Sequence, residues 1–149
     1  MKIEGTYKVP AARDLVYKQL LDPEVLAHAL PGCEALTPNL DGSYQAKMKV
    51  GIAAIKGTYQ GRVEILDPNP PERFRMRVNA QGKGGFLKGE GEITLATVDA
   101  ETTVSYSGET QVGGMIASLG QRMIQAATRR IVDQFFQAFT KQFQQASAS

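Results

Sequence analysis

Apolar and polar residues alternate strictly through most of the chain between positions 44 and 112, and glycine or alanine repeatedly occupies the apolar phase. This alternation is typical of antiparallel strands with one face on a core and the other in water. The opposite phase carries lysine, arginine and glutamate. The phase expected to face inward comprises Tyr44, Ala46, Met48, Val50, Gly57, Tyr59, Gly61, Val63, Ile65, Phe74, Met76, Val78, Ala80, Leu87, Gly89, Gly91, Ile93, Leu95, Val104, Tyr106 and Gly108.

Glycine on an inward phase has two interpretations. It supplies no side chain, so it leaves room on that face, lets the strand bend sharply, or does both. Because glycine and alanine occupy the inward phase so often, we favour a curved sheet that is also hollow over curvature alone. A curved, hollow apolar face predicts a binding cavity rather than a solid core.

The remaining segments complete an α+β order of elements. Residues 2–9 alternate as a first strand, and the helical spacing of 11–21 and 23–30 predicts two short helices divided at Asp22-Pro23. Short turns then join six strands into an antiparallel meander. Those strands are expected at about 33–39, 43–50, 53–66, 72–82, 85–98 and 102–112, and the proline-free stretch 115–145 predicts one long helix.

The apolar stripe of the long helix changes along its length. Its first half carries a slim stripe made of Ile116, Met123, Ile124, Ala127 and Ile131. Its second half carries a wider one made of Val132, Phe135, Phe136, Phe139 and Phe143. We expect the phenylalanine-rich half to dock on the sheet and the slim half to stand over the inward glycines as a cavity wall. Arg122, Arg129 and Asp133 mark the solvent side.

Length and composition predict one soluble domain over residues 1–145, followed by a disordered tail at 146–149. A net charge of +2 without a lysine or arginine run argues against nucleic acid as a partner. The chain shows no signal-peptide pattern and no apolar run of about 18 residues. The single cysteine, Cys33, excludes an internal disulfide and fits a reducing cytoplasm.

The residues offer little for catalysis, for a metal or for a cofactor. His28 is the only histidine, and a site built from it and Cys33 lacks a third group, so both are interpreted as packing residues. The carboxylates of the strands, such as Glu64 and Glu90, fall on the outward phase, away from the expected cavity. The glycine-rich segment 82–91 lacks the GKS or GKT of a phosphate loop. We therefore predict no catalytic residue, no metal and no cofactor.

The outward arginines of the strands allow two explanations. Arg62, Arg73, Arg75 and Arg77 face glutamates on neighbouring strands if the meander is regular, which predicts cross-strand ion pairs. The alternative is an electrostatic docking surface for an acidic partner.

The residues expected to line the cavity are mostly apolar. Two phenols, Tyr59 and Tyr106, need partners if they are buried; these could be a ligand carbonyl, each other or a water. An apolar pocket with a few polar groups is typical of a ligand site. The predicted lining is Leu26, Leu30, Met48, Tyr59, Gly61, Met76, Phe86, Leu87, Gly91, Tyr106, Ile116, Leu119, Met123 and Ala127.

The order of elements resembles the helix-grip fold of the START-like (SRPBCC) superfamily. Several segments narrow this to a resemblance to the G-subunit family of carbon monoxide dehydrogenase, and it covers nearly the whole chain. The segments are ALPGCEAL at 29–36, VGIAAIKGTYQGRVEI at 50–65, DPNPPERFRM at 67–76, GKGGFLKGEGEITL at 82–95, TTVSYSGETQVGG at 102–114 and GGMIASLGQRMI at 113–124.

The resemblance implies an accessory protein to a molybdenum-containing carbon monoxide dehydrogenase or related hydroxylase, with a quinone or lipid as the natural ligand of a START-like cavity. It also implies a role near the membrane. Some members of the family carry an extended tail with a membrane-binding segment, which this chain lacks, so contact is expected to be peripheral at most. Two alternatives stay open: a START-like enzyme, such as a cyclase or hydrolase acting on an aromatic substrate, and an assembly or docking factor whose cavity is incidental. The oligomeric state stays open as well.

Overall fold

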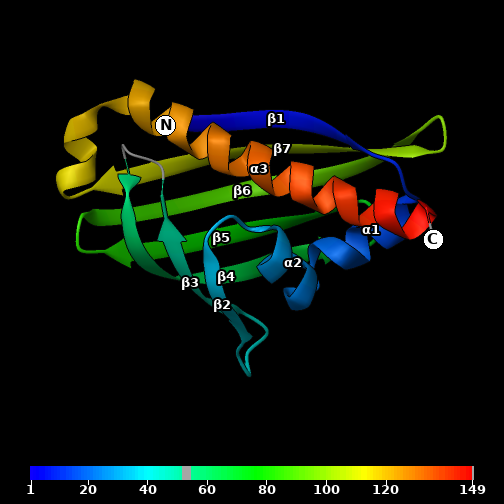
Figure 1. Cartoon of the computed structure of the whole chain (residues 1–149), viewed down its shortest axis with the longest axis horizontal. Helices are drawn as coiled ribbons and strands as arrows, with labels where there is room; N and C mark the ends of the chain where they lie inside the picture. Colours follow the sequence, from blue (N-terminus) through cyan, green and yellow to red (C-terminus); the bar gives the residue numbers. More distant parts are fainter. Residues whose placement is uncertain (52–54, 149) are drawn as a thin grey trace.

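The computed structural model describes residues 1–51 and 55–148, with side chains over 1–51 and 55–143. The elements follow the predicted order of one strand, two short helices, six strands and a C-terminal helix (Figure 1). Their bounds are β1 Lys2–Val9, α1 Arg13–Leu20, α2 Pro23–Ala29, β2 Cys33–Pro38, β3 Tyr44–Val50, β4 Gly57–Asn69, β5 Arg73–Gly82, β6 Gly85–Val98, β7 Glu101–Gly113, the 3₁₀ helix η2 Met115–Leu119 and α3 Gln121–Ala148.

All seven strands form one antiparallel sheet in the order β1-β7-β6-β5-β4-β3-β2. The first strand therefore pairs with the last, and the meander from β2 to β7 lies in sequence order. Helix α3 crosses one face of the sheet, with α1 and α2 beside its C-terminal part (Figure 1). We call the face under α3 the inner face and the opposite one the outer face. The curved sheet around a long helix confirms the predicted α+β fold.

The hydrophobic core lies under the second half of α3. Phe139 is fully buried, and its ring contacts Phe135 and Phe143 at centroid distances of 5.7 and 5.1 Å. Helix α1 contributes Val16 and Tyr17 to the same cluster. Burial of large aromatic side chains is the main favourable term here. The prediction that the phenylalanine-rich half of the long helix docks on the sheet is confirmed.

The prediction of a single long helix from position 115 is wrong. The chain forms η2 first. Gly120, with a φ of 86°, then interrupts the helical backbone before α3 begins at Gln121. A left-handed φ cannot continue a right-handed helix, and glycine adopts it without a steric cost.

Three other boundaries differ from the expected ones. Strand β4 begins at Gly57. The sequence predicted a start near 53, and residues 52–54 lie outside the described residues. The same strand continues to Asn69, past a register shift after Leu66. Helix α3 runs through positions 146–148, which the sequence assigned to the tail, while Ser149 lies outside the described residues.

Candidate ligand-binding site

The register brings the sheet residues of the predicted site, apart from Phe86, onto one face. Met48 pairs with Tyr59, and Met76 pairs with Gly91, so these residues lie opposite one another on neighbouring strands. Exposure alternates along β4, β5 and β6 in the predicted phase, with the charged residues facing outward. The division of these strands into an inward and an outward phase is confirmed.

The inward glycines sit where neighbouring strands approach closely. A Cβ on Gly91 would lie 2.9 Å from the Ser107 carbonyl oxygen and 3.2 Å from Cα of Gly108, the residue opposite. A Cβ on Gly61 would lie 3.0 Å from the Asn79 carbonyl oxygen. At these positions the absent side chain serves the bending of the sheet, because the neighbouring backbone fills the space that it would need.

The inner face divides into a filled half and an open half. The phenylalanines of α3 cover the end that holds Phe74, Leu95 and Val104. Towards the other end the inward residues are apolar but only partly buried, and they do not belong to the core cluster. These partly buried residues are Met48, Val63, Met76, Val78 and Leu87. An apolar face left partly uncovered is the feature that a hydrophobic ligand would complete.

Both predicted phenols have partners within the protein. The Tyr59 hydroxyl donates to the Ile55 carbonyl oxygen at 2.7 Å. The Tyr7 hydroxyl donates a hydrogen bond to the Asp133 carboxylate on α3, and the Tyr7 ring stacks on that of Tyr106 at a centroid distance of 6.2 Å. These three residues connect β7, β1 and α3.

Tyr7 and Tyr106 are held in their neutral forms. Burial raises the pKa of Tyr7, and the hydrogen bond to Asp133 raises it further. Burial also raises the pKa of Tyr106. The Tyr7 ring stacks on Phe136 at 4.2 Å and on Tyr106 at 6.2 Å, which fixes both hydroxyls over the inner face. These phenols act as hydrogen-bond donors and not as bases near neutral pH.

Replacing Tyr7 by phenylalanine is expected to lower the free energy of unfolding by about 1 kcal/mol, the usual net contribution of one hydrogen bond. The raised pKa also predicts a pH dependence. Above pH of about 10 the unfolded chain loses the phenolic proton while the folded protein keeps it, so stability falls as pH rises. Urea unfolding between pH 8 and 11 measures this, and Tyr7→Phe should show the flatter profile. Equal profiles for the two proteins would contradict the assignment.

The predicted site residues of η2 and α3 differ in how deeply they are buried. Ile116 and Ala127 are buried, and Leu119 is half-buried. Met123 is 52% exposed, so it does not pack into the interior as Ile124 and Ala127 do, and its place in the lining of a cavity stays a prediction. The break at Gly120 is the reason, because it turns the start of α3 relative to the continuous helix that the sequence suggested. Ile116 instead anchors η2, with its backbone N–H donating to the Gly84 carbonyl oxygen at 2.9 Å.

The other predicted lining residues lie in two places. Leu26 and Leu30 of α2 pack against the edge of the core cluster, as does Tyr106. Phe86 shares the outward phase of β6 with Lys88, which lies over its ring, so its predicted place on the inward lining is wrong. It borders a hollow of about 370 Å³ that opens between β6, β7 and the start of α3. The lining of this hollow is Met1, Phe86, Thr110, Gln111, Val112, Ala117, Gln121 and Ile124.

A second hollow, of about 420 Å³, lies over β1, β6 and β7, and most of the residues around it carry polar side chains. Glu4, Glu92 and the four Ser and Thr side chains Thr6, Thr94, Ser105 and Ser107 are among the residues around it. Of the predicted site residues, only Tyr106 belongs to this lining.

The arginines of the outer face are held in cross-strand ion pairs. Arg75 contacts Glu90 at 2.9 Å, and Arg77 bridges Glu90 at 3.6 Å and Glu64 at 3.9 Å. Arg73 pairs with Glu92, and Arg62 with Asp41 and Glu64. The predicted ion pairs are confirmed. Their charges are satisfied within the sheet, and each exposed pair contributes less than about 1 kcal/mol.

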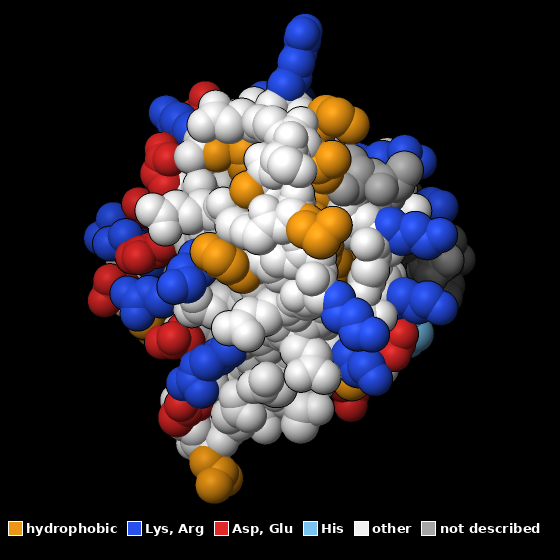
Figure 2. All heavy atoms as spheres, turned by 90° about the vertical axis from the view of Figure 1, so that its left-hand side faces the viewer, with side chains coloured by type: hydrophobic (Ala, Val, Ile, Leu, Met, Phe, Trp, Pro, Cys, Tyr) orange, Lys and Arg blue, Asp and Glu red, His pale blue; other side chains and the backbone are white. Residues whose placement is uncertain are grey.

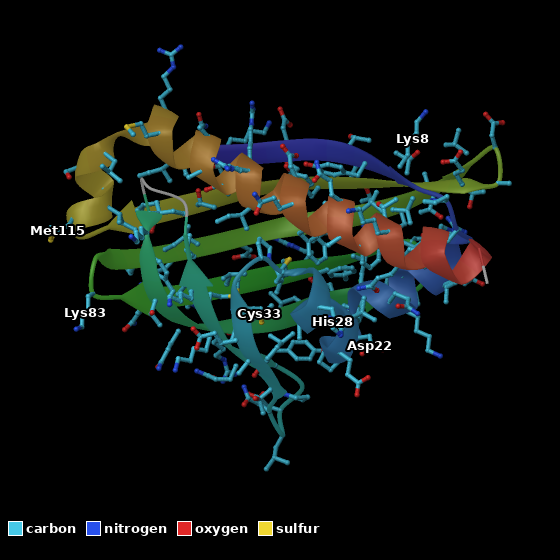
Figure 3. The ribbon with its side chains drawn as sticks, viewed as in Figure 1. Lys8, Asp22, His28, Cys33, Lys83 and Met115 are labelled. Atoms are coloured by element: carbon cyan, nitrogen blue, oxygen red, sulfur yellow. The ribbon has the colours of Figure 1, made fainter. Side chains whose placement is uncertain are left out.

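His28, Glu34 and Glu90 do not line the inner face. His28 is exposed on α2, and Cys33 begins β2 (Figure 3). The Cys33 thiol contacts the Ala35 carbonyl oxygen at 3.5 Å, and burial raises its pKa, which disfavours the nucleophilic thiolate. Glu34 pairs with Lys47 at 3.7 Å, and Glu90 lies in the outer ion-pair network.

Sequence reasoning missed Tyr7, Asp133 and Val112 as parts of the site, whereas Ile124 belongs to the stripe expected as a cavity wall. Tyr7 shares the inward phase of the first strand, so pairing of the first strand with the last would have placed it beside Tyr106. No local pattern indicated that pairing. No sequence signal set Asp133 apart from the other exposed residues of the helix. It is exposed as predicted, but it accepts a hydrogen bond from the Tyr7 hydroxyl.

Solved structures share the fold over nearly the full length. A conserved protein from Geobacillus kaustophilus is 31% identical, with a TM-score of 0.94 and coverage of 98% of this chain and 97% of that one. A START superfamily protein from Mycobacterium smegmatis is 12% identical, with a TM-score of 0.74 and coverage of 97% and 98%. A protein from Thermus thermophilus is 16% identical, with a TM-score of 0.73 and coverage of 99% of both chains. The START-like fold is thereby confirmed.

Among the residues that the structure describes, no helix is both long enough and apolar enough to cross a bilayer. No curated protein sequence matches the chain. Residues 5–144 match the profile of the carbon monoxide dehydrogenase G-subunit (CoxG) family, and because that match spans nearly the whole sequence, the chain belongs to this family.

Proposed function

We propose that the protein is a non-enzymatic carrier of a hydrophobic ligand, a quinone or a lipid. It serves as an accessory protein to a molybdenum-containing carbon monoxide dehydrogenase or a related hydroxylase, on the cytoplasmic side of the membrane. The family supports the accessory role, since the family is described as a subunit of that dehydrogenase. One observation carries the ligand class: the inner face bears partly buried apolar side chains that α3 does not cover.

The open half of the inner face suits an apolar cargo for two reasons. Its side chains are aliphatic or thioether groups, such as Met48, Met76 and Leu87, which pack against rings and chains of varied shape. The charged residues of β4, β5 and β6 lie on the outer face instead. A quinone ring or an acyl chain would bury apolar surface there, at about 25 cal/mol for each Å² removed from water. The predicted lining of the cavity belongs to this proposal.

The cargo is expected to accompany the purified protein. Native mass spectrometry, followed by organic extraction, should show a hydrophobic molecule, and added short-chain benzoquinone or naphthoquinone should bind to emptied protein. Extracts without any hydrophobic molecule, together with no binding of either quinone or of phospholipid, would remove the basis of the carrier proposal. The protein would then be a docking factor, to be pursued through its partner hydroxylase.

A charge placed on the inner face should expel the cargo. Met76→Glu is expected to reduce retained or added ligand at least about tenfold, because burying an unpaired carboxylate costs several kcal/mol. Gln60→Glu is the matched control: it adds the same charge on the exposed outer phase of β4 and should retain the ligand. Circular dichroism checks that both variants fold. Equal ligand loss in both, or in neither, contradicts the assignment of the inner face.

A further inference from the structure

The two edge strands of the sheet are not equally protected against pairing with another strand. Strand β2 has six residues, its register shifts between Cys33 and Ala35, and Pro38 is its last residue. A bulge and a proline are devices that keep an edge unpaired. Strand β1 has neither, because its eight residues pair with β7 without a register shift and include no proline. The edge at β1 is therefore the one to which a further strand can be added.

The register shows which backbone groups of β1 point away from β7. The Met1 amino group donates to the Thr110 carbonyl oxygen at 2.9 Å, and the Thr110 N–H donates to that of Met1 at 2.8 Å. Because bonded and non-bonded pairs alternate along antiparallel strands, the odd-numbered residues of β1 bond to β7 and the even-numbered ones face the free edge. The Lys2 carbonyl oxygen agrees with this, since it accepts from the Gln125 side chain of α3 at 3.2 Å.

Beyond Lys2, the edge of β1 is open. Helix α3 crosses β1 near the start of the strand, and the rest of β1 forms the upper rim of the molecule (Figure 1). Lys8 lies on that rim (Figure 3). Among the described residues, no strand or loop bonds to the backbone N–H and C=O groups of Glu4, Thr6 and Lys8 on this side. A row of unpaired backbone groups is a template for another strand.

The side chains of β1 match a second copy of the same strand. Glu4, Thr6 and Lys8 place an acid, a hydroxyl and a base on the outer phase. If two β1 strands run antiparallel with their Thr6 residues opposite each other, each Glu4 lies opposite Lys8 of the other copy. Two other registers place like charges together, either Lys2 with Lys8 or Glu4 with Glu4. Charged side chains often keep an edge unpaired, but here both signs are present and complement each other.

The inner phase and the overall charge are compatible with the same register. Gly5 of one copy would lie opposite Tyr7 of the other, so a large side chain faces a residue without one. The net charge of +2 gives only weak repulsion between two copies. Figure 2 shows basic and acidic side chains intermingled along the left of the view, on the outer face, so no field of one sign keeps two sheets apart.

We propose that two copies of the protein pair through β1, antiparallel, into one continuous sheet. Glu4, Thr6 and Lys8 of one copy exchange backbone hydrogen bonds with Lys8, Thr6 and Glu4 of the other, and two Glu4–Lys8 ion pairs flank the centre. A second copy fits better than a foreign strand, because the register that satisfies the charges is symmetric, as a two-fold interface requires. One strand pair is smaller than a standard interface, so the dimer dissociates on dilution. The inference goes beyond the carrier proposal, since this edge needs no cargo.

Sedimentation velocity of the whole protein over a range of concentrations tests the proposal, and a dimer should form as the concentration rises. Glu4→Lys and Lys8→Glu should each weaken dimerisation at least about tenfold, because either change turns both ion pairs into like-charge contacts. An equimolar mixture of these two variants should dimerise like the original protein, since opposite charges face each other again. Glu72→Lys and Lys56→Glu make the same changes at exposed positions next to β5 and β4 and should leave dimerisation unchanged.

The backbone bonds have their own pair of variants. Thr6→Pro removes an N–H that faces the free edge and not β7, so the fold should persist, as circular dichroism can check, while the dimer is lost. Thr6→Val keeps that N–H and should dimerise normally. A protein that stays monomeric at every concentration overturns the proposal, as does a dimer that withstands Glu4→Lys, Lys8→Glu and Thr6→Pro. Failure of the mixed variants to associate overturns the register. Because sedimentation needs no ligand, this outcome is separate from that of the carrier proposal.

Discussion

Replacing Phe139 by alanine is expected to lower the free energy of unfolding by about 3–5 kcal/mol. The side chain has no exposed surface, and its ring contacts Phe135 at 5.7 Å, Phe136 at 6.3 Å and Phe143 at 5.1 Å. Truncation would leave a cavity among rings that α3 holds in place. A loss of this size is a large share of the roughly 5–15 kcal/mol that stabilises a typical domain. Urea unfolding followed by circular dichroism measures it.

Phe86→Ala is the matched control for this prediction. The same atoms are removed, but Phe86 is already 39% exposed, on the outward phase of β6. The expected loss is about 1 kcal/mol or less. Similar losses for the two variants would mean that the second half of α3 does not hold the core as the structure shows.

Most of the fold could be predicted from the sequence because two periodicities persist over long stretches. Period-two alternation over β4 to β7 fixes which side chains share a face, and short turns make the strands antiparallel neighbours. Phenylalanine at helical spacing likewise identifies the half of α3 that docks. Each of these signals depends only on residues close in sequence, and each prediction is confirmed.

The features that sequence reasoning missed depend on contacts between distant residues or on one backbone angle. Tyr7 donates to Asp133 across 126 positions, and no local pattern encodes that bond. The single residue Gly120 divides the expected long helix and turns Met123 outward. A helical pattern tolerates one glycine, so periodicity alone cannot tell whether the chain continues through it.

The inward glycines show a third limit of prediction from the sequence. A glycine that leaves space and a glycine that lets a neighbouring strand come close have the same signature in a sequence. The structure separates them by what surrounds each position. Near Gly91 the neighbouring backbone leaves no room, whereas the partly buried Met48, Met76 and Leu87 provide the uncovered apolar surface. The proposed ligand site is therefore defined by what α3 leaves uncovered, and the glycines give the sheet the curvature that brings those side chains together.

Gly91→Ala is expected to destabilise the protein by about 1–3 kcal/mol, the usual effect of forcing atoms into filled space. The new methyl group would lie 2.9 Å from the backbone oxygen of Ser107 and 3.2 Å from Cα of Gly108, and neither atom can move without shifting β7. Chemical unfolding gives the difference in stability. The loss should exceed the roughly 0.4–1 kcal/mol that alanine gains by restricting the unfolded chain.

Gly89→Ala, two residues away on the same strand and face, separates curvature from hollowness. Its new methyl group would meet Cγ2 of Thr110 at 3.2 Å, and that side chain can give way where backbone cannot. We expect a stability within about 1 kcal/mol of the original protein. If Gly91→Ala changed the stability as little as Gly89→Ala, the two strands would not be in close approach. Open space on the inner face would then explain why glycine occupies these positions. If both variants destabilised strongly, the whole β6–β7 pairing would depend on glycine, and the ligand surface would have little tolerance for any change beneath it.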